Sequence, residues 1–349
     1  MANVIKIKKG LDINLKGKAS DVLLNGGKSD TYAIVPDYYN GIVPKVVAKV
    51  GEKVKAGSVL MIDKNRPEIK FVSPVSGEVT AVNRGEKRKV LSIVVKPDAQ
   101  IEYEDFGKKN VASLKGEEVK DAILNAGLWP YIKQRPYDIV ASPADAPRDI
   151  FVSAFYSAPL APNFDFIVKG QEADFQTGLD ALAKLTAGKV YVGVRKGSSV
   201  SVKGVETVEV EGPHPAANVG VQINHIKPVN KGEVVWTVNP ADVIVIGRLF
   251  NKGIADFSRL VVLTGSETTE RGYIKAISGC TVDSLVAGKI LKGNEDVRII
   301  SGNVLTGTKV MKDDYLGAYD NQITVIPEGD ETYDFFGWAT PGFGKYSVS

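Results

Sequence analysis

The sequence predicts an α+β protein of several domains, and three observations carry this prediction. Residues 41–95 contain the same strand–turn–strand motif twice. Strands and amphipathic helices alternate between residues 101 and 256, which is typical of a parallel sheet covered by helices. Residues 257–330 follow the order of two strands, a helix and two strands. A chain of 349 residues has room for two or three domains, so we expect a β barrel-sandwich, a Rossmann-like α/β domain and a β-grasp (ubiquitin-like) domain.

The repeated motif predicts a small closed β domain over residues 37–100. Its copies, residues 47–62 and 79–94, each place a Gly-Glu-Lys turn between two apolar-alternating strands. Between them, residues 71–78 carry the Pro and Gly of a tight reversal. Two such halves bury their apolar faces by packing on one another, which favours a barrel or a sandwich.

This repeat resembles the lipoyl- and biotin-carrier domain, in which one lysine at the tip of the connecting hairpin is covalently modified. Asp63-Lys64 occupies roughly that place here. The hairpin is longer than in a carrier, and Arg66-Pro67 interrupts its tip. These departures favour an unmodified copy of the fold that serves as a scaffold. A carrier component with a modified Lys64 is the alternative.

Residues 1–36 precede the barrel as a segment that we expect to pack on the core. Apolar residues alternate with lysines over residues 4–15, which is typical of an entering strand and loop. Asn25-Gly26-Gly27 reads as a turn, and residues 31–36 read as a strand that a proline ends.

Residues 101–256 carry the signals of the Rossmann-like domain. Apolar residues at helical spacing, acidic residues in the first turn and a final glycine predict a helix over residues 113–127. A second amphipathic helix is predicted over residues 172–187. Asn239-Pro240 supplies the N-cap and first position of a third, over residues 241–251, which Gly253 ends. The predicted strands are residues 149–155, 189–194 and 205–210.

The β-grasp order is predicted for residues 257–330. Thr281 is expected to cap the short helix, which Gly288 ends. Residues 331–349 form a polar and aromatic tail, including Phe335-Phe-Gly-Trp338, that stops without a terminal cap, as though the chain were cut from a longer protein. The predicted strands of this domain are residues 259–265, 273–278, 297–301 and 322–326.

The composition excludes several classes of function. A formal net charge of +3 gives no indication of a nucleic-acid-binding protein. One cysteine, Cys280, excludes an internal disulfide framework and a CxxC-type metal or iron–sulfur site in this chain. The first ten residues lack the apolar stretch of a signal peptide, and no segment reaches the ~20 apolar residues of a membrane span. We therefore expect a cytoplasmic, reducing environment.

Short motifs along the chain identify it as similar to the NqrA family, the soluble subunits of the sodium-pumping NADH:quinone reductases. The related RnfC proteins share the domain types, including the SLBB type of β-grasp domain. The match extends over essentially the whole chain, but the family continues into a C-terminal helical region with cysteines that this sequence does not reach. The residues that carry the resemblance are 5–12, 70–77, 83–88, 127–129, 134–136, 188–192, 212–216, 298–302, 305–309, 315–317 and 336–339.

The resemblance implies a peripheral cytoplasmic component of a membrane complex that moves electrons from NADH to quinone and exports Na⁺. Its expected partners are the other subunits, especially a transmembrane subunit that carries flavin, and quinone (ubiquinone or menaquinone) as a substrate. The family implies no covalent flavin and no iron–sulfur cluster in this chain. We expect the isolated chain to be inactive alone.

A loop at residues 127–137 is the candidate site. Related flavoprotein subunits carry there a glycine-rich loop whose amides cradle a phosphate. Here two prolines remove amides and aromatic residues fill the space, so we expect no tight binding of FMN or NADH. Aromatic rings could instead line a quinone slot, and a cation could bond a quinone carbonyl. The candidate quinone-binding residues are Trp129, Tyr131, Lys133, Arg135 and Tyr137.

The alternative is a purely structural role, in which the aromatic rings cover the sheet and Arg135 pairs with a carboxylate. His214 and His225 lack carboxylate partners nearby in the sequence, so structural roles are favoured over a metal site. Cys280 is expected to be a small buried residue. Three hypotheses follow: a redox-complex subunit that binds quinone, a lipoyl or biotin carrier component, and a purely structural assembly subunit.

Overall fold

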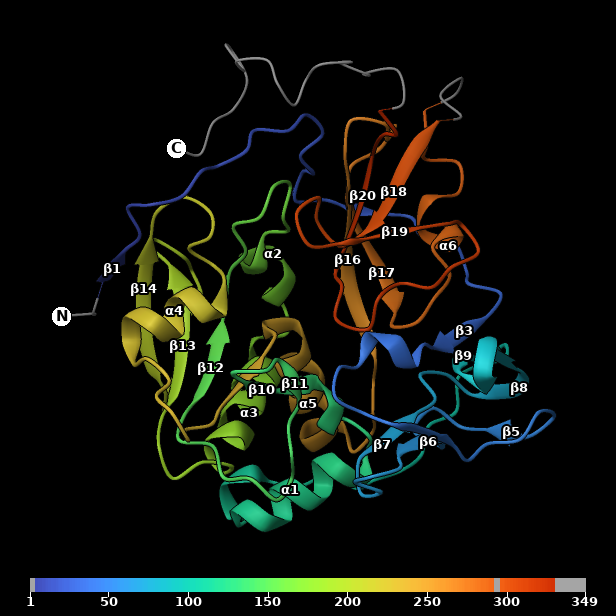
Figure 1. The fold of residues 1–349 in the computed structure, drawn as a ribbon, viewed down its shortest axis with the longest axis horizontal. Helices are drawn as coiled ribbons and strands as arrows, with labels where there is room; N and C mark the ends of the chain where they lie inside the picture. Colours follow the sequence, from blue (N-terminus) through green and yellow to red (C-terminus); the bar gives the residue numbers. More distant parts are fainter. Residues whose placement is uncertain (1–3, 292–295, 330–349) are drawn as a thin grey trace.

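The computed structural model describes residues 4–291 and 296–329. Figure 1 shows the α/β domain along one side of the molecule, with the β-grasp domain and the barrel one above the other beside it. Within the described residues, the strands form sheets of seven, six, four and three strands. This architecture confirms the predicted α+β class and its barrel, α/β and β-grasp parts.

The barrel-sandwich consists of two small sheets that share one buried core, which includes Leu60, Phe71 and Ile93. Because β3 pairs with β9 and buries Ala33 and Ile34, the domain begins at β3 and not at residue 37. One sheet contains β4 (Pro44–Val46), β6 (Val59–Asp63) and β7 (Lys70–Val72). The other contains β3 (Tyr32–Ile34), β9 (Val90–Pro97), β8 (Gly77–Arg84) and β5 (Lys53–Val54).

The tip of the hairpin between β6 and β7 is fastened to the α/β domain. Asp63, which is fully buried, accepts a hydrogen bond from the amide of Val43 and forms an ion pair of 2.7 Å with Arg66. Arg66 also donates to the carbonyl oxygen of Val140 in the α/β domain (3.1 Å). Lys64 is exposed beside these contacts. The hairpin tip is therefore a docked element, in contrast to the free tip on which a swinging arm depends.

The α/β domain is built on a sheet in the order β1-β14-β13-β12-β15-β10-β11. Its first five strands are parallel, β10 runs antiparallel to β15, and β11 at the edge runs antiparallel to β10. The strands are β1 (Val4–Lys6), β14 (Glu206–Glu211), β13 (Val190–Arg195), β12 (Ile150–Ser153), β15 (Val235–Val238), β10 (Ile132–Arg135) and β11 (Ile139–Val140).

Helices cover both faces of this sheet because its central strands are apolar on both sides. In β12, Ile150 and Val152 belong to the core beneath α3 (Glu172–Ala183) and α5 (Pro240–Lys252), whereas Phe151 packs with Ile223 of α4 (Val219–Ile226). Gly253 ends α5 in the left-handed conformation, as predicted. Further helical segments of the chain are α1 (Gly116–Asn125), α2 (Phe164–Val168), η1 (Pro36–Tyr38), η2 (Glu86–Arg88) and η3 (Val111–Ser113).

The β-grasp domain has a mixed sheet in the order β19-β18-β20-β16-β17-β2, with β16 and β20 parallel at its centre. Its short helix, α6 (Asp283–Val286), follows Val282 at the N-cap position, so Thr281 is not the cap that was predicted. The amide of Thr281 is instead bonded to Ser29 Oγ. The strands are β19 (Thr308–Val310), β18 (Val297–Ser301), β20 (Gln322–Pro327), β16 (Ser258–Thr264), β17 (Gly272–Ile277) and β2 (Leu23–Leu24).

The N-terminal segment contributes one strand to each of the three domains. β1 extends the α/β sheet, β2 extends the β-grasp sheet and β3 enters the barrel. In Figure 1 this segment, in dark blue, crosses from the α/β domain to the β-grasp domain. On the way, the carbonyl of Gly17 accepts a bond from Thr264 Oγ1 (2.6 Å), and Asp21 accepts one from Asn163 (2.8 Å). The segment is therefore tied to all three domains by strand pairing.

Residues 128–137 differ from the predicted loop. They form η4 (Trp129–Tyr131) and then β10, because the backbone of residues 132–135 pairs with β15. Strand β15 and helices α2 and α4 were not predicted. The predicted tail, with Phe335–Trp338, lies outside the described residues. Among the helices that are described, none has the length and apolar character needed to cross a membrane.

Candidate functional site

A cleft opens where the α/β sheet changes its winding direction. The chain passes from β12 to β13 through α3 and from β14 to β15 through α4, so the crossover helices lie on opposite faces, with β12 and β15 adjacent. Open α/β sheets bind ligands outside the carboxyl ends of their strands at such a point. Here the cleft has a volume of about 610 Å³ and is bordered by Ser153, at the end of β12, and Val238, at the end of β15. This volume suits a small molecule.

Two cations of β10 line one wall of the cleft. Antiparallel pairing places Lys133 opposite Thr237 and Arg135 opposite Val235, and paired residues project to the same face of a sheet. Asp138 lies 3.7 Å from Lys133 Nζ and 3.4 Å from Arg135 Nη2. The side chains of Lys133 and Arg135 are 22% and 30% exposed. Both cations are therefore partly desolvated yet accessible from the cleft.

Three aromatic residues, Tyr131, Phe155 and Tyr156, also line the cleft. The hydroxyl of Tyr156 accepts a hydrogen bond of 2.6 Å from Asn321 in the β-grasp domain. Burial raises the pKa of the Tyr156 hydroxyl, so its ring stays neutral. Neutral rings beside cations suit a flat apolar ligand that carries hydrogen-bond acceptors at its edge.

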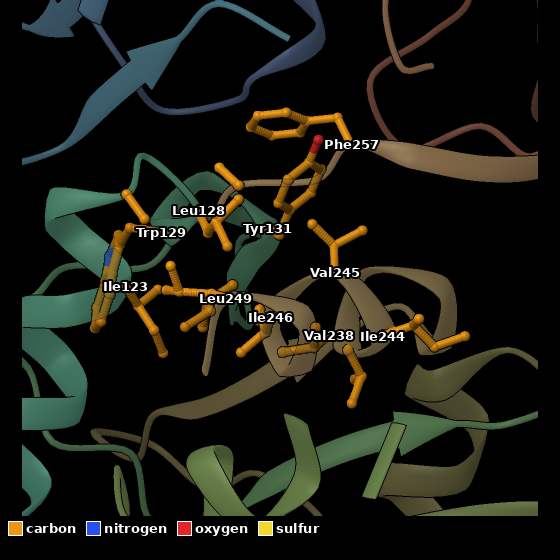
Figure 2. Close-up of a cluster of buried hydrophobic side chains, with 14 of the residues drawn as sticks. Ile123, Leu128, Trp129, Tyr131, Val238, Ile244, Val245, Ile246, Leu249 and Phe257 are labelled. Atoms are coloured by element: carbon orange, nitrogen blue, oxygen red, sulfur yellow. The ribbon is translucent and has the colours of Figure 1, made fainter. Parts of the chain in front are cut away.

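Trp129 lies in the core and not in the cleft. It is fully buried, and its indole Nε1 donates to the carbonyl oxygen of Ala141 (2.8 Å). Its ring meets that of Trp236 edge to face at 5.3 Å. Figure 2 shows Trp129 beside Ile123 within a cluster of apolar side chains. This residue holds α1 and η4 against the sheet.

Tyr137 does not line the cleft, and 79% of its surface is exposed. Tyr131 is buried next to Phe257, yet one side of it borders the cleft. Of the predicted quinone residues, the structure therefore brings Tyr131, Lys133 and Arg135 together. It places Trp129 and Tyr137 elsewhere.

The first turn of α5 reaches the cleft but is occupied from within the protein. Asn239 is its N-cap, and Pro240 at the first position has no amide to donate. Asp242, also in the first turn, is fully buried and forms an ion pair of 3.0 Å with Arg259. Burial raises the pKa of the Asp242 carboxyl to about 6, against the opposing effect of Arg259. Because a carboxylate already faces the positive end of this helix, the turn offers little to an external anion.

Comparison with known proteins agrees with this arrangement of domains. Residues 5–98 match the family described as NqrA N-terminal barrel-sandwich hybrid domain, residues 114–255 the NqrA second alpha/beta domain, and residues 260–312 the NQRA C-terminal domain. The NqrA protein of the Na(+)-translocating NADH-quinone reductase of Neisseria meningitidis serogroup A is 38% identical over 99% of this chain and 78% of its own length. The corresponding protein of Yersinia pestis bv. Antiqua is 37% identical over the same shares. The chain belongs to the NqrA family of Na⁺-translocating NADH-quinone reductases.

The likeness of this NqrA-family chain to solved structures is more remote. A chain of the NAD⁺-reducing nickel–iron hydrogenase in its H2-reduced state shares 12% identity, with a TM-score of 0.42 over 62% of this chain and 47% of that one. A likeness of this size carries no functional argument.

Sequence reasoning missed the part of the cleft of this NqrA-family chain that α4 and β15 provide. Asn218, the N-cap of α4, and the next two residues, Val219 and Gly220, line it together with Thr237 of β15. A signal for them exists in the sequence. Residues 234–238, apolar except for Thr237, run directly into Asn239-Pro240, which places the end of a strand at the start of a helix. Polar residues at such a junction point to the ligand-binding edge of a parallel sheet.

The histidines and the cysteine of this NqrA-family chain lie outside the cleft. The His214 ring is 3.0 Å from Ser157 Oγ, and the His225 ring is 2.8 Å from the carbonyl oxygen of Val221 in its own helix. Cys280 is buried, as predicted, and burial raises the pKa of its thiol to about 11. Among residues 4–291 and 296–329, no group of three or more His, Cys, Asp or Glu side chains is placed to hold a metal ion.

Proposed function

We propose that this chain is a peripheral component, on the cytoplasmic side of the membrane, of a complex that passes electrons from NADH to quinone and exports Na⁺. We further propose that it binds a quinone ring in the cleft between α4 and β10. Membership of the NqrA family supports the role in the complex. The observation that carries the quinone role is the convergence of Lys133 and Arg135 with the rings of Tyr131, Phe155 and Tyr156 on one cleft.

The chemistry of the cleft fits that of a quinone. A quinone has flat apolar faces and two carbonyl oxygens at its edge, so it needs an apolar wall and hydrogen-bond donors in one plane. The aromatic residues supply the wall, and the ammonium group of Lys133 or the guanidinium of Arg135 can donate to a carbonyl. Lys133 Nζ lies 4.0 Å from the centre of the Tyr319 ring, which holds the ammonium in place. Cations at this edge also stabilise the negative charge that reduction places on the oxygen.

The proposal includes no flavin, no iron–sulfur cluster and no covalent cofactor in this chain. In the segment that would cradle a flavin phosphate, Pro130 and Pro136 lack amides, and Trp129 and Tyr131 pack into the core. Cys280 alone supplies too few thiolates for a cluster. Electrons would reach the quinone from partner subunits, above all from a transmembrane subunit that carries flavin. Micromolar affinity of the isolated chain for NADH would contradict this part of the proposal.

Titration of the purified chain with a short-tailed ubiquinone, followed by calorimetry, tests the quinone role. We expect saturable binding that Lys133→Met and Arg135→Met each weaken by about tenfold, because each removes a charge-assisted hydrogen-bond donor. Lys189→Met is the matched control, since Lys189 pairs with Glu206 on the surface, away from the cleft. The control should bind like the wild type.

Failure of the wild-type chain to bind quinone would remove the quinone role and favour a purely structural role in assembly. Equal losses in Lys133→Met and Lys189→Met would place the quinone outside this cleft. The carrier alternative depends on modification of Lys64, next to a hairpin tip that Arg66 ties to the α/β domain. The intact mass of the chain after co-expression with lipoyl and biotin ligases checks it, and we expect the unmodified mass.

A further inference from the structure

The start of α4 differs from the usual first turn of a helix because its donors are left open. Asn218 occupies the N-cap position, where an asparagine side chain commonly bonds a first-turn amide, yet it makes no such bond here. The amides of Val219 and Gly220, the first two helical residues, have no carbonyl partner inside the helix. All three residues line the cleft. A methyl group added at Gly220 would meet no atom within 4 Å, so the approach to these amides is open.

Thr237 adds a hydroxyl donor to the lining of the same cleft. It is only 5% exposed and lines the cleft, and its hydroxyl makes no hydrogen bond with any residue in the described part of the chain. The hydroxyl oxygen is not among the fully buried atoms that lack a partner, so it is reached from the cleft and is free to bond a ligand there. On the neighbouring strand, Ser153 is bonded instead to Ala217 and Gln222. The hydroxyl that lacks a partner is therefore the one beside Lys133.

The charges around this corner favour an anion. Lys133 is the strand partner of Thr237, and Arg135 follows it on the same face. Asp138 is the one carboxylate among the residues that line the cleft, and it is engaged by both cations. The positive end of α4 adds to the field of the two cations. A neutral carbonyl would use only part of this set of donors.

We propose that the start of α4 and the hydroxyl of Thr237 form an oxyanion subsite within the cleft, which holds one quinone oxygen in its negatively charged form. The inference rests on the proposed quinone function and adds a preference to it. Rings with an ionised oxygen, such as a semiquinone, a deprotonated quinol or an ionised hydroxyquinone, bind more tightly than neutral rings of the same shape. The subsite thus stabilises the reduced ligand more than the oxidised one.

Two matched naphthoquinones test this preference without any redox step. The compound 2-hydroxy-1,4-naphthoquinone is an anion at neutral pH, because its hydroxyl is a vinylogous acid, and its 2-methoxy analogue is neutral. We expect the full chain to bind the anion about tenfold or more tightly than the methoxy compound, as measured by calorimetry. Inorganic phosphate is a third probe, and millimolar phosphate should leave the affinity for the methoxy compound unchanged.

Three variants separate the subsite from the rest of the cleft. Thr237→Val should lose about tenfold in affinity for the anion and little for the methoxy compound, and Thr237→Ser should retain the wild-type preference. Asn218→Asp places a carboxylate at the subsite, so it should weaken binding of the anion selectively. The stability of the fold should not fall, because the Asn218 side chain makes no capping bond and aspartate suits the N-cap position equally well.

The outcomes distinguish the two proposals. Binding of both naphthoquinones with equal affinity in the wild type, unchanged by Thr237→Val and Asn218→Asp, would overturn the subsite and leave the quinone function standing. Binding of neither compound would overturn both. Displacement of the methoxy compound by micromolar phosphate would also overturn the subsite as proposed, because it would then suit a phosphate group better than a ring oxygen.

Discussion

Helices α4 and α5 begin at the same cleft, but only α4 leaves the hydrogen-bond donors of its first turn available to a ligand. The start of α5 is closed, because Pro240 lacks an amide and the carboxyl of Asp242 is paired with Arg259 of the β-grasp domain. The start of α4 is open: the N-cap residue Asn218 makes no side-chain capping bond, and both Asn218 and the exposed Gly220 line the cleft. Both helix starts present partial positive charge. The protein satisfies that charge internally where the helix joins two domains and leaves it free where the cleft is accessible.

The two helices also differ in how deeply they are buried. α5 is buried along nearly its whole length, and it packs on α3 so closely that glycines form the contact. α4 covers the sheet with one side, chiefly through Ile223, and exposes the other. We therefore expect changes at α5 to alter the stability of the protein and changes at the start of α4 to alter ligand binding.

The largest effect is expected from Arg259→Met. The substitution leaves the Asp242 carboxyl without its partner, which should cost about 3–5 kcal/mol of unfolding free energy at pH 8. At pH 5 the loss should be smaller. A carboxyl whose pKa in the folded state is raised to about 6 stabilises the fold at low pH, and this stabilisation is lost as the pH rises through that value. Without Arg259 the pKa rises further, so at pH 5 the group is protonated and carries no unpaired charge.

Urea denaturation at the two pH values measures this difference. The double variant Asp242→Asn, Arg259→Met should recover part of the stability, since it removes the buried charge altogether. A loss that is the same at both pH values would show that the pair does not set the stability of the α5 start.

A matched pair of glycine substitutions gives the next largest effect. A methyl group at Gly247 of α5 would lie 1.7 Å from the carbonyl oxygen of Asp174 in α3, so Gly247→Ala must separate the helices and should cost about 3 kcal/mol. Gly220→Ala in α4 meets open space and should be neutral or stabilise the fold by up to about 1 kcal/mol. Thermal or urea unfolding compares the two. Equal costs would remove the contrast between the helices.

The smallest expected effect concerns Asn218→Ala. An asparagine that caps a helix contributes about 1 kcal/mol. Because the Asn218 side chain makes no capping bond, we expect its removal to cost less than about 0.5 kcal/mol. Asn163→Ala is the comparison, since Asn163 accepts a bond from the amide of Asp165 and also bonds Asp21. If both variants lost the same stability, Asn218 would be a structural cap and not a free donor.

The sequence was sufficient for elements whose signals are local. Asn239-Pro240 and Gly253 carry the start and end of α5 in their backbone preferences, and the repeated Gly-Glu-Lys turns indicate the barrel. β10 could not be predicted in this way. Its four residues stand between prolines, and they form a strand only because β15 is there to pair with them. The strand thus depends on tertiary structure and not on local propensity.

The same limit explains which part of the cleft was predicted. The family resemblance pointed to residues 127–137, and within them the cations Lys133 and Arg135 stand out beside aromatic residues. Trp129 could not be separated from them, because an aromatic ring that fills a core and one that lines a slot look alike in a sequence. Thr237 and Asn218 become neighbours only through β15 and α4, which are too short for a periodic signal.

The N-terminal segment has a consequence for the order of events during folding. Its residues are made first, but their partners lie far along the chain: Ser29 bonds Thr281, 252 residues later, and Thr31 bonds Tyr315, 284 residues later. Contacts over such separations form late, because a long loop must close before they provide any stabilisation. At the ~5–20 residues per second of synthesis, the segment waits tens of seconds for its partners. Ser29 and Thr31 are thus among the first residues to leave the ribosome and among the last to make their native contacts, which join the N-terminal segment to the β-grasp domain.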